Sequence, residues 1–215
     1  MTARATFTNP GHNCDLCPRL CDFRTDNRGK FPDKHNAPVP SFGDVSARLL
    51  IVGLAPGLRG ANFSGRPFTG DYAGDLLYST LLKYNLARGI YKADPNDGIE
   101  LIDTRVTNAV RCVPPQNKPT PDEIRTCRPF LVDEIAAMPN LQVILTLGQI
   151  SHDSVLRTLG EKPSQYKFAH AAIHRPADKP VIVNTYHSSR YNVNTNRLTV
   201  PMFHQVFDKI TALMK

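Results

Sequence analysis

Four cysteines in two widely separated groups constrain the fold of this chain more than any other feature. Cys14 and Cys17 form a C-x2-C pair near the start, whereas Cys112 and Cys127 lie near the middle of the 215-residue sequence. Four thiolates can hold a zinc ion or a [4Fe–4S] cluster. If these four share one centre, the beginning of the chain must fold against its middle.

The spacing of the second group favours iron–sulfur over zinc, because zinc sites more often pair two short knuckles. Cys112 and Cys127 are instead separated by a proline-rich stretch at 113–121 and a predicted helix. Buried free cysteines, which pack as small hydrophobic residues, are the alternative interpretation. Cys21 is the fifth cysteine, and we predict that it packs or lies at the surface rather than binding metal.

Length and composition indicate one domain over residues 1–215, with an irregular N-terminal arm at 1–47. Hydrophobic residues make up 41% of the chain, enough for a core. No run approaches the ~18 apolar residues that a membrane span needs, and the N-terminus is polar. We therefore expect a soluble cytoplasmic protein with no membrane association, and a monomer by default.

The chain is basic, with a formal charge of +7 and an isoelectric point near 9.3. Such a charge favours a polyanionic partner, and nucleic acid is the first candidate. A basic soluble protein without such a partner is the other interpretation of the charge. The basic residues are spread along the sequence, so folding must assemble any binding surface.

Strand-like and helical patterns alternate along the chain. Short apolar runs typical of buried strands lie at 49–54, around 106, at 143–147 and at 181–183. Helical patterns lie at 71–88, from the capping box Thr120-Pro-Asp-Glu123 onward, at 149–159 and at 200–214. This alternation predicts an α/β domain with a mainly parallel sheet, whose site lies outside the carboxyl ends of the strands.

Two motifs follow predicted strands and so fall at that edge. Gly53-Leu-Ala-Pro-Gly57 ends the first strand in a glycine-rich turn, which brings backbone N–H groups close to a ligand. It is followed by Gly65-Arg-Pro-Phe-Thr-Gly-Asp71, and the segment 187–192 follows the last strand.

The order of the motifs resembles that of a known family. The matching segments are Cys14-x-x-Cys17-Pro-Arg-Leu, Pro40-Ser-Phe-Gly-Asp44, the motif from Gly53 to Asp71, Thr107-Asn-Ala-Val-Arg-Cys-Val-Pro-Pro115, Tyr186-His-Ser-Ser-Arg-Tyr-Asn192 and Asn196-Arg-Leu-Thr199. Together they resemble the uracil-DNA glycosylase superfamily, most closely its iron–sulfur family 5. Leu54 is part of this pattern, since family 4 carries a polar residue there.

The resemblance implies a three-layer α/β/α sandwich around a short, mainly parallel four-stranded sheet. It implies a structural [4Fe–4S] cluster on Cys14, Cys17, Cys112 and Cys127. The implied activity is that of a DNA repair hydrolase, which flips uracil and other deaminated bases out of DNA and cleaves the N-glycosidic bond to leave an abasic site. Such an enzyme would work in the cytoplasm, associated with the nucleoid.

The resemblance also implies roles for individual residues. Phe68 would stack on the flipped base, Asn108 would match its Watson–Crick edge, and His187 would donate to a base carbonyl. The turn residues Gly53, Leu54, Ala55 and Gly57 would complete the binding site with their backbone groups. Asp71 would position water or stabilise the sugar cation. The alternatives are core packing for Phe68, turn capping for Asn108, a structural histidine at 187 and a helix N-cap at Asp71.

The segment 188–192 resembles a loop that enters the duplex. Ser189 would bind phosphate, and Arg190 or Tyr191 would fill the gap left by the base. Ser188 stands where the family usually has proline. Further candidate phosphate neighbours are Arg59, Arg66, Arg111, Lys118 and Arg197. The rival functions are a non-catalytic, metal-stapled nucleic-acid-binding module and a zinc or redox protein.

Overall fold

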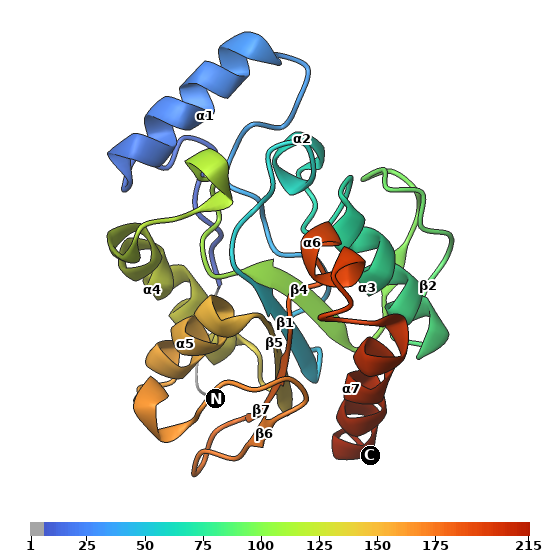
Figure 1. The fold of residues 1–215 in the computed structure, drawn as a ribbon. Coiled ribbons are helices and arrows are strands. Elements are labelled where there is room, and N and C mark those ends of the chain that lie inside the picture. Colours follow the sequence, from blue (N-terminus) through green and yellow to red (C-terminus); the bar gives the residue numbers. More distant parts are fainter. Residues whose placement is uncertain (1–6) are drawn as a thin grey trace.

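A five-stranded sheet with the order β4-β1-β5-β7-β6 runs through the centre of the computed structural model, which describes residues 7–215 (Figure 1). Its parallel strands are β1 Leu49–Gly53, β4 Thr104–Asn108, β5 Val143–Leu147 and β7 Val181–Thr185. The mainly parallel sheet is confirmed. The expected count of four strands is wrong by one, because β6 (Ile173–His174) adds an antiparallel edge too short for a recognisable sequence pattern.

Helices cover both faces of the sheet and give the expected three layers. α3 (Tyr72–Lys83) and α7 (Val200–Leu213) lie on one side, whereas α4 (Pro121–Ala137) and α5 (Gln149–Thr158) lie on the other (Figure 1). The shorter elements are α2 Ala61–Ser64, α6 Arg190–Asn194, β2 Ala87–Arg88, β3 Glu100–Leu101 and the 3-10 turns Pro115–Asn117 and Pro163–Gln165. Across residues 7–215, none of the helices combines the length and the apolar character that a bilayer crossing requires.

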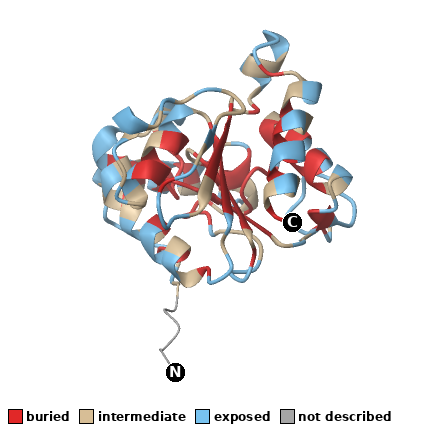
Figure 2. Ribbon diagram, turned by 90° about the horizontal axis from the view of Figure 1, so that it is seen from below, coloured by how far each residue is buried: buried red, intermediate tan, exposed pale blue. Residues whose placement is uncertain are grey.

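The two-sided burial of the central strands explains why β1 and β5 are almost entirely apolar in sequence. Leu49 and Ile51 pack toward α3 and α7, whereas the intervening Leu50 and Val52 pack toward α4 and α5. All five residues of β1, β4 and β5 are therefore buried, and Figure 2 shows the strands as the buried centre of the molecule. Strands covered on both faces show no alternation of apolar and polar residues.

The helix α3 ends at Lys83, five residues before its predicted boundary at Arg88. Asn85 adopts a left-handed conformation with φ of 57°. The N–H of Leu86 then donates to Leu81 O at 2.9 Å, and that of Asn85 to Leu82 O at 3.2 Å. These two bonds form a Schellman motif, in which asparagine replaces the usual glycine. Gly89, the glycine directly after the predicted boundary, lies after β2 instead.

The N-terminal arm is not irregular, because Pro18–Lys30 forms the 13-residue helix α1. Residues 1–6 of the expected arm lie outside the described part of the chain. The buried residues of α1 are Leu20, Arg24 and Asn27, which share one helix face at the i, i+4, i+7 spacing. Two of these three are polar, so the face that packs inward carries no hydrophobic periodicity.

The capping box of α4 generates a stability prediction. Thr120 Oγ1 accepts from Glu123 N–H at 3.2 Å, and Glu123 Oε2 accepts from Thr120 N–H at 2.7 Å. Thr120→Ala removes the side-chain half of this exchange and should lower the free energy of unfolding by about 1 kcal/mol. Urea unfolding followed by circular dichroism measures the change. Thr211→Ala is the control, since its hydroxyl binds only carbonyls of its own helix; an equal loss there would contradict the capping role.

Candidate active site and cysteine cluster

Two adjacent parallel strands end side by side and begin the site. Gly53 of β1 is the register partner of Asn108 of β4, so the motif turn and the carboxamide start at the same edge of the sheet. A Cβ at Gly53 would lie 2.4 Å from Asn108 Oδ1 and 2.5 Å from Phe68 Cζ. Only glycine allows these three residues to meet here. Gly53 therefore forms the base of the site.

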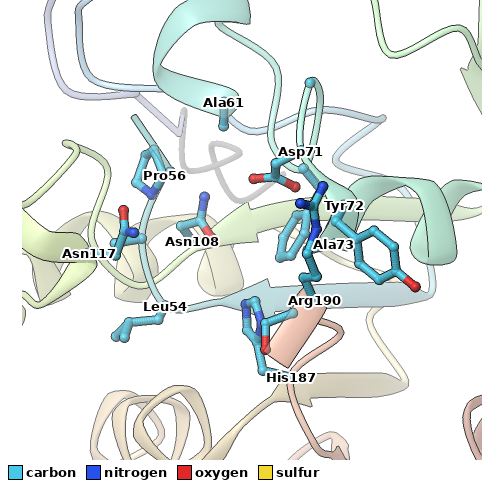
Figure 3. Close-up of a pocket in the computed structure, with 15 residues that line it drawn as sticks. Leu54, Pro56, Ala61, Asp71, Tyr72, Ala73, Asn108, Asn117, His187 and Arg190 are labelled. Carbon is cyan, nitrogen blue, oxygen red and sulfur yellow. The ribbon is translucent and has the colours of Figure 1, made fainter. Parts of the chain in front are cut away.

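A pocket of about 580 Å³ opens above these strand ends (Figure 3). We call it the strand-end pocket, and its lining comprises Leu54, Ala55, Pro56, Gly57, Ala61, Phe68, Gly70, Asp71, Tyr72, Ala73, Asn108, Asn117, His187, Ser189 and Arg190. The candidates Leu54, Ala55, Gly57, Phe68, Asp71, Asn108, His187, Ser189 and Arg190 all line this one pocket, whereas Gly53 and Tyr191 do not. Its volume falls within the range of ~300–1,000 Å³ typical of small-molecule sites.

Phe68 and His187 face the pocket from different motifs. Their ring centroids are 6.2 Å apart with an interplanar angle of 32°. Phe68 is only 6% exposed, so it packs in the core and lines the pocket at once. Its φ of 54° places a bulky residue in the left-handed region, which is rare outside glycine, asparagine and aspartate.

Asn108 and His187 offer polar groups to the pocket. Among residues 7–215, the Asn108 carboxamide and the His187 imidazole have no hydrogen-bond partner. Burial lowers the pKa of His187, so its imidazole is neutral near pH 7 and carries one N–H donor. Both side chains are therefore available to a ligand.

Asp71 combines the two roles that its sequence position allows. It is the N-cap of α3, where Oδ1 accepts from Gly74 N–H at 3.2 Å. Its other oxygen lies against the glycine-rich turn, since a Cβ on Gly60 would be 2.4 Å from Oδ2 and one on Gly57 would be 3.2 Å away. Burial raises the pKa of this carboxyl, and the backbone N–H groups of α3 oppose the shift. Asp75, one turn on, is exposed and does not line the pocket.

The loop after β7 is held from both ends. Ser188 is fully buried, and its hydroxyl donates to Ala73 O at 3.1 Å, which ties the loop to α3. Ser189 Oγ accepts from Asn192 N–H at 3.4 Å and caps α6. The guanidinium of Arg190 lies 5.5 Å from the centre of the Tyr72 ring at the pocket wall (Figure 3). Serine thus anchors this loop where the family pattern has proline.

All five cysteines converge on a second, small cavity; we call them the cysteine cluster. Cys14 and Cys17 come from the turn before α1, Cys112 follows β4, and Cys127 lies on α4. The Arg24 guanidinium donates to Cys112 Sγ, and the Arg111 backbone N–H donates to Cys127 Sγ, each at 3.4 Å.

Burial raises the pKa values of the thiols in the cysteine cluster. The pKa of Cys17 rises to about 11 and that of Cys112 to about 12, with burial as the largest cause in both. No three His, Cys, Asp or Glu side chains within residues 7–215 are arranged around a single metal ion. Cys21 differs from the rest because its thiol donates to Cys14 O at 3.2 Å.

Comparison with known proteins identifies the family. Residues 40–211 match the family model described as the uracil DNA glycosylase superfamily. The chain belongs to the uracil-DNA glycosylase superfamily. A type-5 uracil-DNA glycosylase from Thermus thermophilus is 38% identical over 208 residues, which cover 94% of each chain.

Other relatives share the same name. A type-5 uracil-DNA glycosylase from Pyrobaculum aerophilum is 35% identical and is matched over 96% of this chain and 91% of its own. One from Mycobacterium leprae is 38% identical, with 90% and 88% covered. The likeness spans the N-terminal arm as well as the sheet, so this superfamily member falls in the type-5 group.

The prediction that Arg66 and Arg111 lie near phosphate is wrong. Arg66 is bound to Asp97 at 2.8 Å, and Arg111 is bound to Glu134 at 2.6 Å, with both guanidiniums almost fully buried. Arg59, Lys118 and Arg197 are exposed and stay candidates. The sequence pattern cannot distinguish a buried arginine from an exposed one, because the partner acids lie more than twenty residues away.

Sequence reasoning missed several residues of the pocket. Five of them lie in the motif from Gly53 to Asp71 or directly after it, so proximity in sequence was the available signal: Pro56, Ala61, Gly70, Tyr72 and Ala73. Asn117 has a different origin. It comes from the proline-rich stretch between Cys112 and Cys127, where Asn117 has a φ of 57°. The same stretch therefore connects the cysteine cluster to the strand-end pocket.

The close packing around Gly53 makes its replacement informative. Gly53→Ala places a methyl group within 2.5 Å of Asn108 and Phe68, and overpacking should lower the free energy of unfolding by about 1–3 kcal/mol. Gly29→Ala is the matched control. A Cβ at Gly29 in α1 would have no atom within 4 Å, so this substitution should leave the free energy of unfolding unchanged or raise it. Denaturant unfolding of both variants measures the difference; equal stabilities would contradict the packing described here.

Proposed function

We propose that this protein is a monofunctional uracil-DNA glycosylase, which hydrolyses the N-glycosidic bond of uracil and other deaminated bases in DNA and leaves an abasic site. The observation that supports this most is the convergence of Asp71, Asn108 and His187 on one pocket in a chain related to type-5 uracil-DNA glycosylases. DNA is the partner in this proposal, the protein acts as a monomer, and the compartment is the cytoplasm with its nucleoid.

The strand-end pocket suits a base taken out of the stack. A base inside a duplex is inaccessible, so the enzyme must flip the nucleotide into a closed site with a stacking face. Phe68 supplies that face, and the Asn108 carboxamide, with both a donor and an acceptor, pairs with the Watson–Crick edge of the base. The backbone of the turn from Gly53 to Gly57 completes the contact surface.

Bond cleavage in this mechanism separates charge. The departing base gains negative charge while the sugar becomes oxocarbenium-like. The neutral His187 imidazole donates its N–H to a carbonyl oxygen of the base and stabilises the developing anion. The Asp71 carboxylate stabilises the sugar cation and orients the water that attacks it.

Water is the nucleophile in this proposal. Lysine is the residue that Schiff-base lyase chemistry needs, and in the described chain none lines the strand-end pocket. Arg190 or Tyr191 enters the duplex gap, and Tyr191 is 72% exposed at the start of α6. Ser189, in addition to capping α6, lies at the pocket wall where a phosphate would pass.

We further propose that Cys14, Cys17, Cys112 and Cys127 hold a [4Fe–4S] cluster. Four thiolates are a suitable donor set, and N–H donation from Arg24 and the Arg111 backbone favours sulfur in its ionised form. Buried thiols with raised pKa values resist ionisation without a metal, whereas iron supplies the compensating charge. The iron–sulfur cluster has a structural role in this proposal, because it links α1 to the end of β4 and to α4.

The catalytic assignment predicts a loss of turnover without a loss of binding. Asp71→Asn and His187→Gln should each slow release of uracil from an oligonucleotide by on the order of 10²–10³. Single-turnover base release measures the rate, and fluorescence anisotropy measures DNA affinity, which should stay unchanged. Asp75→Asn is the control. Affinity for DNA without any base release by the intact protein would support the non-catalytic binding module instead.

The metal assignment predicts different outcomes for two neighbouring cysteines. Cys17→Ser should lower the iron content and the visible absorption of the purified protein, whereas Cys21→Ser should retain both, because Cys21 is not a ligand. Metal analysis and absorption spectra of the anaerobically purified variants provide the test. Colourless protein loaded with zinc would contradict the iron–sulfur proposal while leaving the glycosylase proposal intact.

A further inference from the structure

The backbone around Phe68 is held by groups that the proposed chemistry does not use. Phe68 keeps a left-handed φ of 54°, an unfavourable conformation that persists only when its surroundings enforce it. Tyr91 Oη donates to Phe68 O at 3.2 Å, and Tyr78 Oη donates to Pro67 O at 2.8 Å. The Phe68 carbonyl also lies directly on Gly74, where a Cβ would be 1.7 Å away.

A buried arginine fixes the other side of the same turn. Arg66 is 5% exposed, and its Nε donates to Thr69 Oγ1 at 2.7 Å. Its two terminal nitrogens bind the two oxygens of Asp97 at 2.8 and 2.9 Å. A bidentate pair of this kind defines the orientation as well as the distance of the guanidinium.

Aromatic rings enclose this guanidinium. Its Cζ lies 5.3 Å from the ring centres of Phe42 and Tyr78 and 5.8 Å from that of Tyr91. The rings of Tyr78 and Tyr91 stack on each other with centroids 4.5 Å apart. Tyr91 thus contacts the cation with its ring and the Phe68 carbonyl with its hydroxyl.

Both Tyr91 and Asp97 belong to the segment 89–99 between β2 and β3, beside α3 (Figure 1). Asp97 shapes this segment, because its carboxylate accepts from Lys92 N–H at 2.9 Å and from Ile99 N–H at 3.1 Å. The Arg66 guanidinium holds the pKa of Asp97 well below its usual range, so the pair stays charged at neutral pH. None of these residues lines the strand-end pocket.

We propose that the segment 89–99, through Tyr91 and the Arg66–Asp97 pair, positions the ring of Phe68 against the base. This inference rests on the proposed function for its consequence in catalysis, whereas the hold on the Phe68 backbone stands without it. Tyr91 is a positioning residue, since it acts through Phe68 and does not touch the pocket.

Amide hydrogen exchange tests whether Tyr91 holds the backbone of Phe68, and this experiment does not depend on catalysis. Tyr91→Phe keeps the ring stack and removes only the hydroxyl, so amide hydrogen exchange across residues 66–71 should accelerate by on the order of fivefold. Tyr84→Phe is the control, because it also removes a single hydroxyl, which at the far end of α3 has His204 O at 2.8 Å and Asp208 Oδ1 at 2.7 Å as acceptors. Unchanged exchange in Tyr91→Phe, or equal acceleration in both variants, would overturn the proposal.

The consequence for catalysis is tested by a double-mutant cycle in the protein carrying its metal. Tyr91→Phe should slow single-turnover uracil release by about three- to tenfold. In a Phe68→Leu background the same change should have almost no further effect, because the ring it positions is gone. Equal slowing in both backgrounds would show that Tyr91 does not act through Phe68.

Two cases need a separate interpretation: a Tyr91→Phe variant that does not fold, and a wild-type protein that releases no uracil. If Tyr91→Phe does not fold, Tyr78→Phe, which frees the neighbouring Pro67 carbonyl, replaces it in both experiments with the same expectation. If the wild-type protein releases no uracil, the proposed function fails, while the exchange experiment still decides whether Tyr91 holds the backbone of Phe68.

Discussion

The site depends on the parallel pairing of β1 with β4, which brings Gly53 and Asn108 to the same height at the edge of the sheet. Because Gly53 has no side chain, the Phe68 ring and the Asn108 carboxamide can both approach the strand end closely. Two further side chains complete the polar lining of the pocket. Asp71 begins α3 on one wall, and His187 follows β7 on the other.

The cysteine cluster supports this edge from outside the sheet. α1 buries one apolar residue, Leu20, which packs with Val110 in a small cluster, so polar contacts contribute much of what holds this helix. Arg24 holds it against Cys112, which comes four residues after Asn108, and Arg19 binds both oxygens of Glu123 on α4. A cofactor at these thiols would strengthen the anchor of the strand that carries the carboxamide. The stretch between Cys112 and Cys127 also delivers Asn117 to the pocket.

Buried cations change the meaning of the basic composition. Arg66, Arg105 and Arg111 form ion pairs with Asp97 and Glu134 in the interior, and Glu134 serves two of them. These arginines organise loops and strand ends rather than attract an external polyanion. The net charge of +7 counts these buried arginines as well as the exposed basic residues. Only the exposed ones can contribute to a DNA-binding surface.

The sequence by itself determined most of the order of strands and helices and the motifs at the strand ends, whereas the site roles of Phe68, Asn108 and His187 were expected from the resemblance to a known family. The order and the motifs follow from local rules: apolar runs, a capping box and glycines that only a turn explains. The helix α1 and the fifth strand depended on tertiary contacts, because polar residues face inward in α1 and β6 is only two residues long. The early end of α3 is local, but asparagine at Asn85 replaces the glycine that usually signals a C-cap. Tertiary structure alone decided which arginines are buried and how Tyr91 reaches Phe68. Partners that lie twenty or more residues apart leave no periodic signal in the chain, and only the packed fold brings their charges and rings into contact.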